Sequence, residues 1–332
     1  MSRRQTLSEP FIIEFADKLN WYHIMKCQKL SELCILQCIN YINPDQIRFR
    51  NLSEAFVREN MNIIRSDEMF ACQTLSESFI REFAEDEFDW IIISTYQELS
   101  ESFIREFADS VDWERISSYQ KLSESFIREF ADKVHWYYIS ESQKLSESFI
   151  REFADKVNWV RIIYNQKLSE AFIGEFDNRV HWSCISLGQT LSRSFIRKYN
   201  HRVDWMQISR HQNLSESLIR QFAHKVNWAN ISQYQTLSMS FIKCYSHMVD
   251  WSKISQYQKL SNSFIRKNID KVDWPKISQY QTLSESFIRQ FANRVNWLYI
   301  SEYQTMSDSF MAEYIDKVEW KKVFNRLNVI HK

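Results

Sequence analysis

The chain has 332 residues, 44% of them hydrophobic and 25% charged, and its 42 basic and 42 acidic side chains cancel at neutral pH. No run of 18 apolar residues occurs, and Met1 to Gln5 lead directly into a repeated segment, so we expect neither a membrane-spanning helix nor a signal peptide. The six cysteines fall at unrelated positions of the repeat, which favours reduced, mostly buried thiols of a cytosolic type over a disulfide framework. They are Cys27, Cys34, Cys38, Cys72, Cys184 and Cys244.

The chain is built from repeats of 23 residues. The segment Gln120 to Ser142, QKLSESFIREFADKVHWYYISES, recurs along the sequence, and counting in both directions gives about fourteen copies. When each repeat is numbered from its first residue as position 0, all 12 tryptophans fall on position 16, or on 17 in one lengthened copy. Such tandem similarity is typical of a solenoid, in which each repeat covers the apolar face of its neighbour. We therefore predict a single array over residues 1–332, with degenerate repeats in 5–72, regular repeats in 73–303, and a final repeat with a C-terminal cap in 304–332.

The first half of each repeat has the pattern of an amphipathic helix. Ser100 suits the N-cap, where its hydroxyl accepts a hydrogen bond from a free N–H of the first turn. We expect charges on the polar face to pair within the helix, as Glu101 and Arg105 are spaced to do, and a basic residue such as Lys133 to meet the negative end of the helix. The apolar stripe of this copy is Leu99, Phe103, Ile104, Phe107 and Val111.

A shorter second helix is predicted from position 15 onward. That position holds asparagine or aspartate, both favoured N-caps, in most repeats. The three prolines support the helix starts, because Pro10 falls in the first turn of a first helix and Pro44 and Pro275 in the first turn of a second helix. Proline lacks a backbone N–H, and it is tolerated in the first turn because an N–H there has no intrahelical partner. The exceptions at position 15 are Arg65, His135, His181 and Glu319.

These patterns predict an all-α fold, an αα-hairpin solenoid of about fourteen 23-residue repeats. Leucine-rich repeats have a similar period, but their strand-and-asparagine pattern is absent. The chain also holds only 2 glycines, which disfavours a turn-rich β-solenoid.

The repeats nearest the N-terminus depart most from the pattern. Leu30 to Phe49 resembles an F-box in its leucine-rich helix followed by Pro-Asp, although the repeat register explains the same residues. Cys34 and Cys38 lie four residues apart, with Cys27 and His23 nearby, which suits either a zinc site or buried structural thiols. We favour the thiols. At the other end, Lys321 to Lys332 has a helical pattern and is predicted to cap the array.

The zero net charge conceals an asymmetry. Residues 1–165 carry a net charge of −9 and residues 166–332 a net charge of +9, with His counted as neutral. The two fields act locally in an elongated array and favour antiparallel pairing of two copies, although surface ion pairs contribute little. We expect a monomer or a weak, salt-sensitive dimer.

No catalytic motif occurs: the sequence has no Gly-rich phosphate loop, no H-E-x-x-H, no paired CxxC and no nucleophile elbow. His201, His224 and His247 occupy position 12 of three successive repeats and predict a row spaced by about 9–10 Å, which is too wide to share a metal ion. A pH-responsive basic row and a neutral surface row both fit them. We expect a protein that is not an enzyme and holds no cofactor and no metal.

Positions 17, 18 and 21 vary between repeats while the tryptophan stays constant. Positions 17 and 21 are neighbours on the second helix, so stacking would align them in an exposed stripe. The stripe is either a recognition surface or a solvent face free to drift. The candidate binding residues are Tyr137, Tyr138, Arg161, Gln207, Arg210, Asn230, Lys253, Lys276 and Tyr299. The tryptophans, among them Trp113, Trp136, Trp159, Trp182, Trp205 and Trp228, are predicted to be structural core residues.

The leading hypothesis for function is a non-enzymatic protein-binding or scaffold repeat protein. The alternative is nucleic-acid binding through the basic half, Arg193 to Arg294, where basic rows beside aromatic rings could contact phosphates.

The repeat wording L-S-E-S-F-I-R-E-F-A-D-K-V-x-W-x-x-I-S-x-Y-Q-K resembles tandem-repeat proteins of giant DNA viruses and some phages. The resemblance covers essentially the whole chain. It is weakest in Arg50 to Cys72, where the repeat register shifts and the tryptophan is absent. It implies expression in the cytoplasm of an infected host cell and brings no activity or site residues. By analogy with viral ankyrin arrays, it implies a protein partner from the host.

Overall fold

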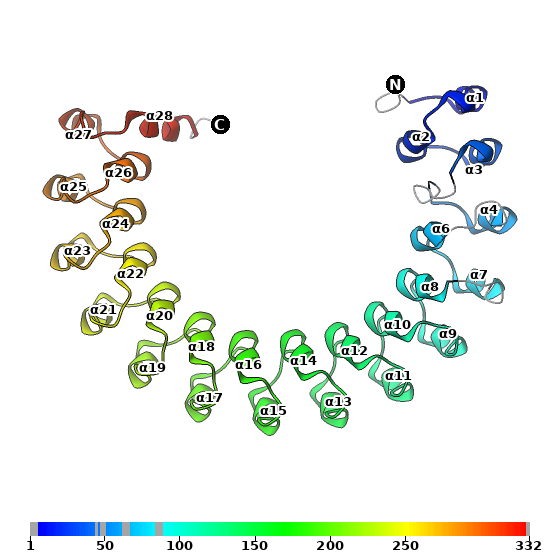
Figure 1. Cartoon of the computed structure of the whole chain (residues 1–332), viewed down its shortest axis with the longest axis horizontal. Helices are drawn as coiled ribbons and strands as arrows, with labels where there is room; N and C mark the ends of the chain where they lie inside the picture. Colours follow the sequence, from blue (N-terminus) through cyan, green and yellow to red (C-terminus); the bar gives the residue numbers. More distant parts are fainter. Residues whose placement is uncertain (1–5, 44–45, 47–50, 62–66, 84–88, 330–332) are drawn as a thin grey trace. The chain divides into compact units, whose positions relative to one another are not determined.

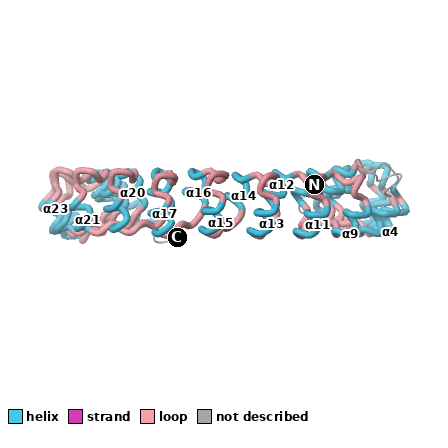
Figure 2. The backbone as a smooth tube through the Cα atoms, turned by 90° about the horizontal axis from the view of Figure 1, so that it is seen from below, coloured by secondary structure: helices cyan, strands magenta, loops and turns pink. Residues whose placement is uncertain are grey.

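The protein is described from a computed structural model, which covers residues 6–43, 46, 51–61, 67–83 and 89–329. It forms two compact units, Met1–Gln166 and Lys167–Lys332, each described by itself. All regular structure in the described residues is helical, and each regular repeat supplies a first helix and a second helix joined by short loops (Figures 1 and 2). The predicted all-α solenoid of αα-hairpins is confirmed.

Unit 1 contains thirteen of the α-helices that the structure describes. Its first helices are α1 (Glu9–Glu14), α3 (Glu32–Gln37), α4 (Glu54–Glu59), α7 (Glu77–Glu82), α9 (Glu101–Glu106), α11 (Glu124–Glu129) and α13 (Glu147–Glu152). Its second helices are α2 (Trp21–Cys27), α6 (Asp67–Cys72), α8 (Trp90–Tyr96), α10 (Trp113–Tyr119), α12 (Trp136–Ser142) and α14 (Trp159–Asn165). Two 3₁₀ turns, η1 (Ala16–Lys18) and η2 (Ile39–Tyr41), follow α1 and α3.

Unit 2 is more regular and follows the same alternation. Its first helices are α15 (Glu170–Glu175), α17 (Arg193–Lys198), α19 (Glu216–Gln221), α21 (Met239–Cys244), α23 (Asn262–Lys267), α25 (Glu285–Gln290) and α27 (Asp308–Glu313). Its second helices are α16 (Trp182–Gly188), α18 (Trp205–His211), α20 (Trp228–Tyr234), α22 (Trp251–Tyr257), α24 (Trp274–Tyr280), α26 (Trp297–Tyr303) and α28 (Trp320–Val329). The longer α28 agrees with the helix predicted for the C-terminal tail.

Side-chain caps begin both helices of the regular repeats, as the sequence predicted. The Ser100 hydroxyl accepts a hydrogen bond from the Phe103 N–H at 3.2 Å and begins α9. The Asp112 carboxylate accepts from the Arg115 N–H at 2.9 Å and begins α10. Where position 15 is histidine, as at His135, the helix begins without a side-chain bond. Short polar residues at these two positions therefore fix where each helix starts.

The prolines occupy the expected places. Pro10 lies in the first turn of α1 and Pro275 in the first turn of α24. Pro44 lies outside the described residues, as does part of the F-box-like segment. The described part of that segment, α3 and η2, repeats the helix and 3₁₀ turn of the preceding copy.

The first helices are shorter than the apolar stripe suggested. Helix α9 ends at Glu106, and a turn follows in which the Val111 N–H donates to the Phe107 carbonyl at 3.0 Å. Val111 is still buried because this turn folds it back onto the repeat. The stripe therefore spans a short helix and the turn after it.

In each unit the second helices pack directly on one another in a row, and the first helices form a second row beside it (Figure 1). The small serine at position 20 permits this close packing, and Ser117 exposes 0% of its surface. Its hydroxyl donates to the Trp113 carbonyl at 2.6 Å and accepts from the His135 N–H of the next repeat at 2.9 Å. One buried hydroxyl thus joins two neighbouring second helices.

The core consists of positions 6, 7 and 19, where Phe103, Ile104 and Ile116 are fully buried. Tryptophan covers this core from outside: Trp113 packs on Phe126 of the next repeat with ring centroids 6.3 Å apart, and its indole N–H donates to the Ala108 carbonyl at 2.9 Å. The predicted core tryptophans are half-buried rather than fully enclosed, because one ring edge stays at the surface between two repeats. These are Trp113, Trp136, Trp159, Trp182, Trp205 and Trp228.

The glutamine at position 0 joins successive repeats through their loops. Gln258 is 6% exposed, and its amide donates to the carbonyls of Ser232 at 2.9 Å and Gln235 at 2.7 Å. Its side-chain oxygen accepts from the Leu237 N–H at 3.1 Å. The bond from the leucine N–H recurs from Leu7 with Gln28 to Leu283 with Gln304. Gln258 therefore satisfies two backbone groups of the preceding repeat and one, the Ser232 carbonyl, of the repeat before that. Burial would otherwise leave these groups unpaired.

Charged residues pair within helices, as expected, and also between repeats. The pairs within a helix include Arg81 with Glu77 at 3.8 Å and Arg128 with Glu124 at 3.7 Å. Arg105 contacts Glu129 of the next repeat at 2.7 Å, and this contact lowers the pKa of the Glu129 carboxyl. Lys133 reaches back to the preceding repeat, donating to the Ala108 carbonyl at 3.2 Å and pairing with Asp109 at 2.6 Å. Contacts between repeats are shorter for the same cation: Arg81 and Arg128 each lie 2.8 Å from a glutamate of the next repeat.

The cysteines are free thiols, but the expectation that most are buried is wrong. Only Cys34 and Cys38 are buried, while Cys27, Cys72 and Cys244 are exposed. The exposed thiols lie at helix ends, where repeats leave the side chain outside the core. Within the described residues no group of three or more metal-ligating side chains comes together, and none of the helices combines the length and apolar character needed to span a bilayer.

Candidate functional site

Four exposed tyrosines stand in successive repeats of unit 2, each as the last residue of a second helix. We call them the tyrosine row: Tyr234, Tyr257, Tyr280 and Tyr303, exposed to 44%, 46%, 47% and 49%. In unit 1 the same position is exposed tyrosine at Tyr96 and Tyr119. Position 22 was not among the predicted binding positions, although its tyrosine recurs at the repeat spacing in six copies. Tyrosine rings that recur in successive repeats and lie half outside the core are not explained by packing.

Basic side chains lie over three of these rings, with the charged group 5.2 to 5.7 Å from the ring centroid. Such contacts stabilise by about 0.5–1 kcal/mol at exposed sites. They also place a positive charge beside each aromatic face. The pairs are Arg210 with Tyr234, Lys253 with Tyr257, and Lys276 with Tyr280.

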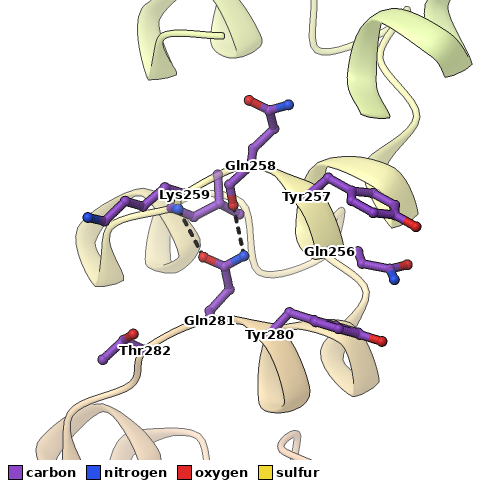
Figure 3. A pocket seen from close by; sticks show the side chains of 8 residues that line it. Gln256, Tyr257, Gln258, Lys259, Tyr280, Gln281 and Thr282 are labelled. Atoms are coloured by element: carbon purple, nitrogen blue, oxygen red, sulfur yellow. Dashed lines mark hydrogen bonds between the residues drawn. The ribbon is translucent and has the colours of Figure 1, made fainter. Parts of the chain in front are cut away.

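A hollow of about 220 Å³ lies between Tyr257 and Tyr280. Figure 3 shows both rings pointing to the same side, together with the side chain of Gln256. The Gln281 amide lies between the loop that follows α22 and the loop that follows α24, and it donates to the Gln258 carbonyl at 2.8 Å. A similar hollow of about 230 Å³ adjoins Tyr119 in unit 1. A shallow hollow therefore adjoins the exposed tyrosine in both places, and the one in unit 2 is lined by two consecutive tyrosines.

The predicted stripe residues of unit 1 contact one another and their neighbours. Arg161 lies over the Tyr137 ring at 4.7 Å, hydrogen-bonds its hydroxyl, and pairs with Glu141 at 3.1 Å. The Tyr138 hydroxyl donates to Glu114 at 3.2 Å, and this carboxylate raises the pKa of the tyrosine. All three stripe residues are half-buried. They join consecutive second helices, which limits their availability to a partner.

The predicted residues of unit 2 divide into two groups. Gln207 and Asn230 lie half-buried between helices, and the Asn230 amide donates to the Met206 carbonyl at 3.1 Å. Arg210, Lys253, Lys276 and Tyr299 instead gather at the tyrosine row, where Tyr299 lies 6.2 Å from Tyr303. The structure therefore brings Arg210, Lys253, Lys276 and Tyr299 together at the tyrosine row, whereas Gln207 and Asn230 lie between helices.

The first helices of unit 2 form a row, called here the first-helix row, whose surface is basic. In unit 1 the arginine at position 8 faces a glutamate of the next repeat, whereas Arg197 faces the Gln221 amide at 2.9 Å and Arg266 the Gln290 amide at 2.8 Å. Residues 193–271 hold 13 Lys or Arg and 4 Asp or Glu. Two of these acids, Asp204 and Asp250, cap their own helices. Of the 13 basic residues, 7 lie on α17, α19, α21 and α23, and the others lie in turns, in loops and on second helices.

The three predicted row histidines are exposed in the turns after α17, α19 and α21. These histidines are His201, His224 and His247, each at position 12 of its repeat.

The fold and these surfaces define the class of the protein: an α-helical solenoid whose 23-residue repeats present one row of tyrosines and one row of basic side chains. Comparisons with protein families, with curated proteins and with solved structures found no match to this chain.

Proposed function

We propose that the protein is a non-enzymatic binding protein whose tyrosine row in unit 2 holds a partner protein. The observation that carries the proposal is the exposure of four tyrosines in successive repeats, each at 44% or more. Tyrosine is enriched at protein interfaces and among their hot spots, because its ring is large and loses little conformational entropy. The hollow between Tyr257 and Tyr280 can receive a side chain of the partner. Because the tyrosines recur at a constant spacing, the partner can make a similar contact with each repeat.

The proposal is tested with the double variant Tyr257→Ser, Tyr280→Ser. Lys267→Ser is the matched control, because Lys267 is exposed on the first-helix row. The wild type and the control should retain the same protein from a host-cell lysate after cross-linking, and the double variant should lose it. Circular dichroism melting verifies that both variants fold. Equal retention by the double variant, or no retained protein at all, contradicts the proposal.

A second candidate function is nucleic-acid binding by the first-helix row of unit 2. The specific observation in its favour is that Arg197 and Arg266 face amides instead of carboxylates. A guanidinium without a neutralising partner is available to phosphate oxygens, and such binding weakens steeply with salt.

Gel-shift titration at about 50 mM and 200 mM salt tests this candidate. Arg197→Ala with Arg266→Ala should weaken binding of a single-stranded RNA. Arg105→Ala, in which the lost arginine is paired with Glu129, should leave it unchanged. Absence of binding by the wild type at the lower salt concentration rejects the candidate.

A further inference from the structure

We propose that the segment held by the tyrosine row is a proline-rich peptide in the polyproline II conformation, with one turn of the peptide on each repeat. This inference rests on the proposed protein-binding function and specifies the chemistry of the partner. It is carried by the spacing of the row, the hollow between Tyr257 and Tyr280, and the charge beside them.

The spacing of the row matches one turn of a polyproline II helix. Helices α20, α22, α24 and α26 pack directly on one another, and packed helices lie about 8–10 Å apart. Polyproline II has three residues per turn and rises about 3.1 Å per residue, or about 9 Å per turn. A peptide lying along the row would therefore present the same face to every tyrosine.

The other extended and helical conformations do not stay in register with the row. In a β-strand, residues on one face recur at about 7 Å and then about 13 Å. An α-helix returns after two turns at about 11 Å, but its 3.6 residues per turn rotate the contact face away along the row. Only the three-residue period repeats over four successive repeats.

The chemistry of the hollow also suits this conformation. Tyr257 and Tyr280 line a hollow of about 220 Å³ together with Gln256 and Leu260. This volume is large enough for a pyrrolidine ring beside the tyrosines (Figure 3). Polyproline II makes no internal hydrogen bonds, so its carbonyls need donors. Tyrosine hydroxyls supply them, as does the Gln256 amide, which points to the same side as the rings.

The charge beside the row selects an acidic peptide. Lys253 and Lys276 lie over the rings of Tyr257 and Tyr280 at 5.7 and 5.6 Å. Helices α20, α22 and α24 contain no Asp or Glu of their own. The last helix of the row, α26, holds Glu302, and this carboxylate pairs with Lys322 at 2.9 Å. The partner is therefore a proline-rich segment that carries a carboxylate in each turn, placed to pair with the lysines.

Fluorescence anisotropy with labelled peptides of the form (Pro-Pro-Glu)n, with n from two to six, tests the inference on the full chain. The affinity should rise with each added turn and level off at four turns, because the row has four tyrosines. The Tyr257→Ser, Tyr280→Ser variant should bind (Pro-Pro-Glu)4 at least about tenfold more weakly, as expected when hot-spot aromatics are truncated. Lys267→Ser should bind as the wild type does.

The flexible peptide (Gly-Ser-Glu)4 has the same length and charge and should bind at least about tenfold more weakly than (Pro-Pro-Glu)4, because it pays the entropy of ordering. Equal affinity of the two peptides would show that charge alone is recognised and would overturn the inference. If no peptide binds while the lysate partner still depends on the tyrosines, the inference is wrong and the proposed function stands. Tyrosine-dependent binding of a single-stranded RNA that displaces the peptide would make the row a nucleic-acid site and would also overturn it.

Discussion

Replacing one position-0 glutamine by methionine tests whether these amides hold the repeats together. In Gln258→Met the apolar side chain has a similar length and fills the same space, so the cavity cost is small. The variant loses three hydrogen bonds, to the Leu237 N–H at 3.1 Å and to the carbonyls of Ser232 at 2.9 Å and Gln235 at 2.7 Å. At about 1 kcal/mol net for each bond, the free energy of unfolding should fall by about 3 kcal/mol.

Amide hydrogen exchange measured by mass spectrometry is the suitable assay, because long repeat arrays unfold region by region rather than in one transition. A loss of about 3 kcal/mol should speed exchange of the protected amides around Leu237 by about a hundredfold. The control is Gln256→Met, two residues away, where the side chain lies at the edge of the hollow beside Tyr257. If exchange in Gln258→Met equals that of the control, the glutamine amide is not a buried link between repeats and the reasoning fails.

Three further outcomes follow from the described contacts. Trp228→Ala should lower the free energy of unfolding by about 3 kcal/mol, because the indole packs on the next repeat but is only half-buried. Chemical denaturation measures this, and an unchanged midpoint would mean that the ring contributes nothing to packing. The hydrogen bond from the Ser307 N–H lowers the pKa of Glu285, so its stabilising contribution is present above the unfolded pKa and is lost as the pH falls; melting curves from pH 7 to 3 should fall less steeply in Glu285→Gln, and parallel curves would contradict this. Burial raises the pKa of the Cys34 thiol to about 11, so iodoacetamide at pH 7.5 should label Cys244 and spare Cys34 in the folded protein, as read by mass spectrometry; equal labelling would place both thiols in solvent.

The positions of the helices could be predicted from the sequence because their start signals are local. A serine such as Ser100 and an aspartate such as Asp112 each satisfy a backbone N–H two or three residues on, which requires no knowledge of the tertiary fold. The lengths of the first helices could not be read in the same way. Val111 continues the apolar spacing after α9 has ended, because a turn returns it to the core face.

The candidate site was harder to predict. A recurring residue shows that the same surroundings recur in each repeat, but it does not show whether the side chain is buried or exposed. Gln258 recurs as faithfully as tryptophan and is buried, whereas Tyr257 recurs in four successive repeats and is exposed. Ser117 is polar and is nevertheless fully enclosed between two helices, which the repeat pattern does not reveal. The pairing of Arg105 with Glu129 likewise depends on which repeat faces which, and a single helix does not contain that information.

The direction of the glutamine bonds has a consequence for how the chain is synthesised. Gln258 makes its three hydrogen bonds with residues earlier in the chain, two in the preceding repeat and one, at Ser232, in the repeat before that. The loop at Gln258 in turn receives the Gln281 side chain of the repeat after it. On the ribosome, an emerging repeat therefore leaves its own loop carbonyl and leucine N–H unsatisfied until about one more repeat has left the exit tunnel. We expect the array to order vectorially, from its N-terminal end, with the boundary of the folded part trailing the growing chain by one repeat.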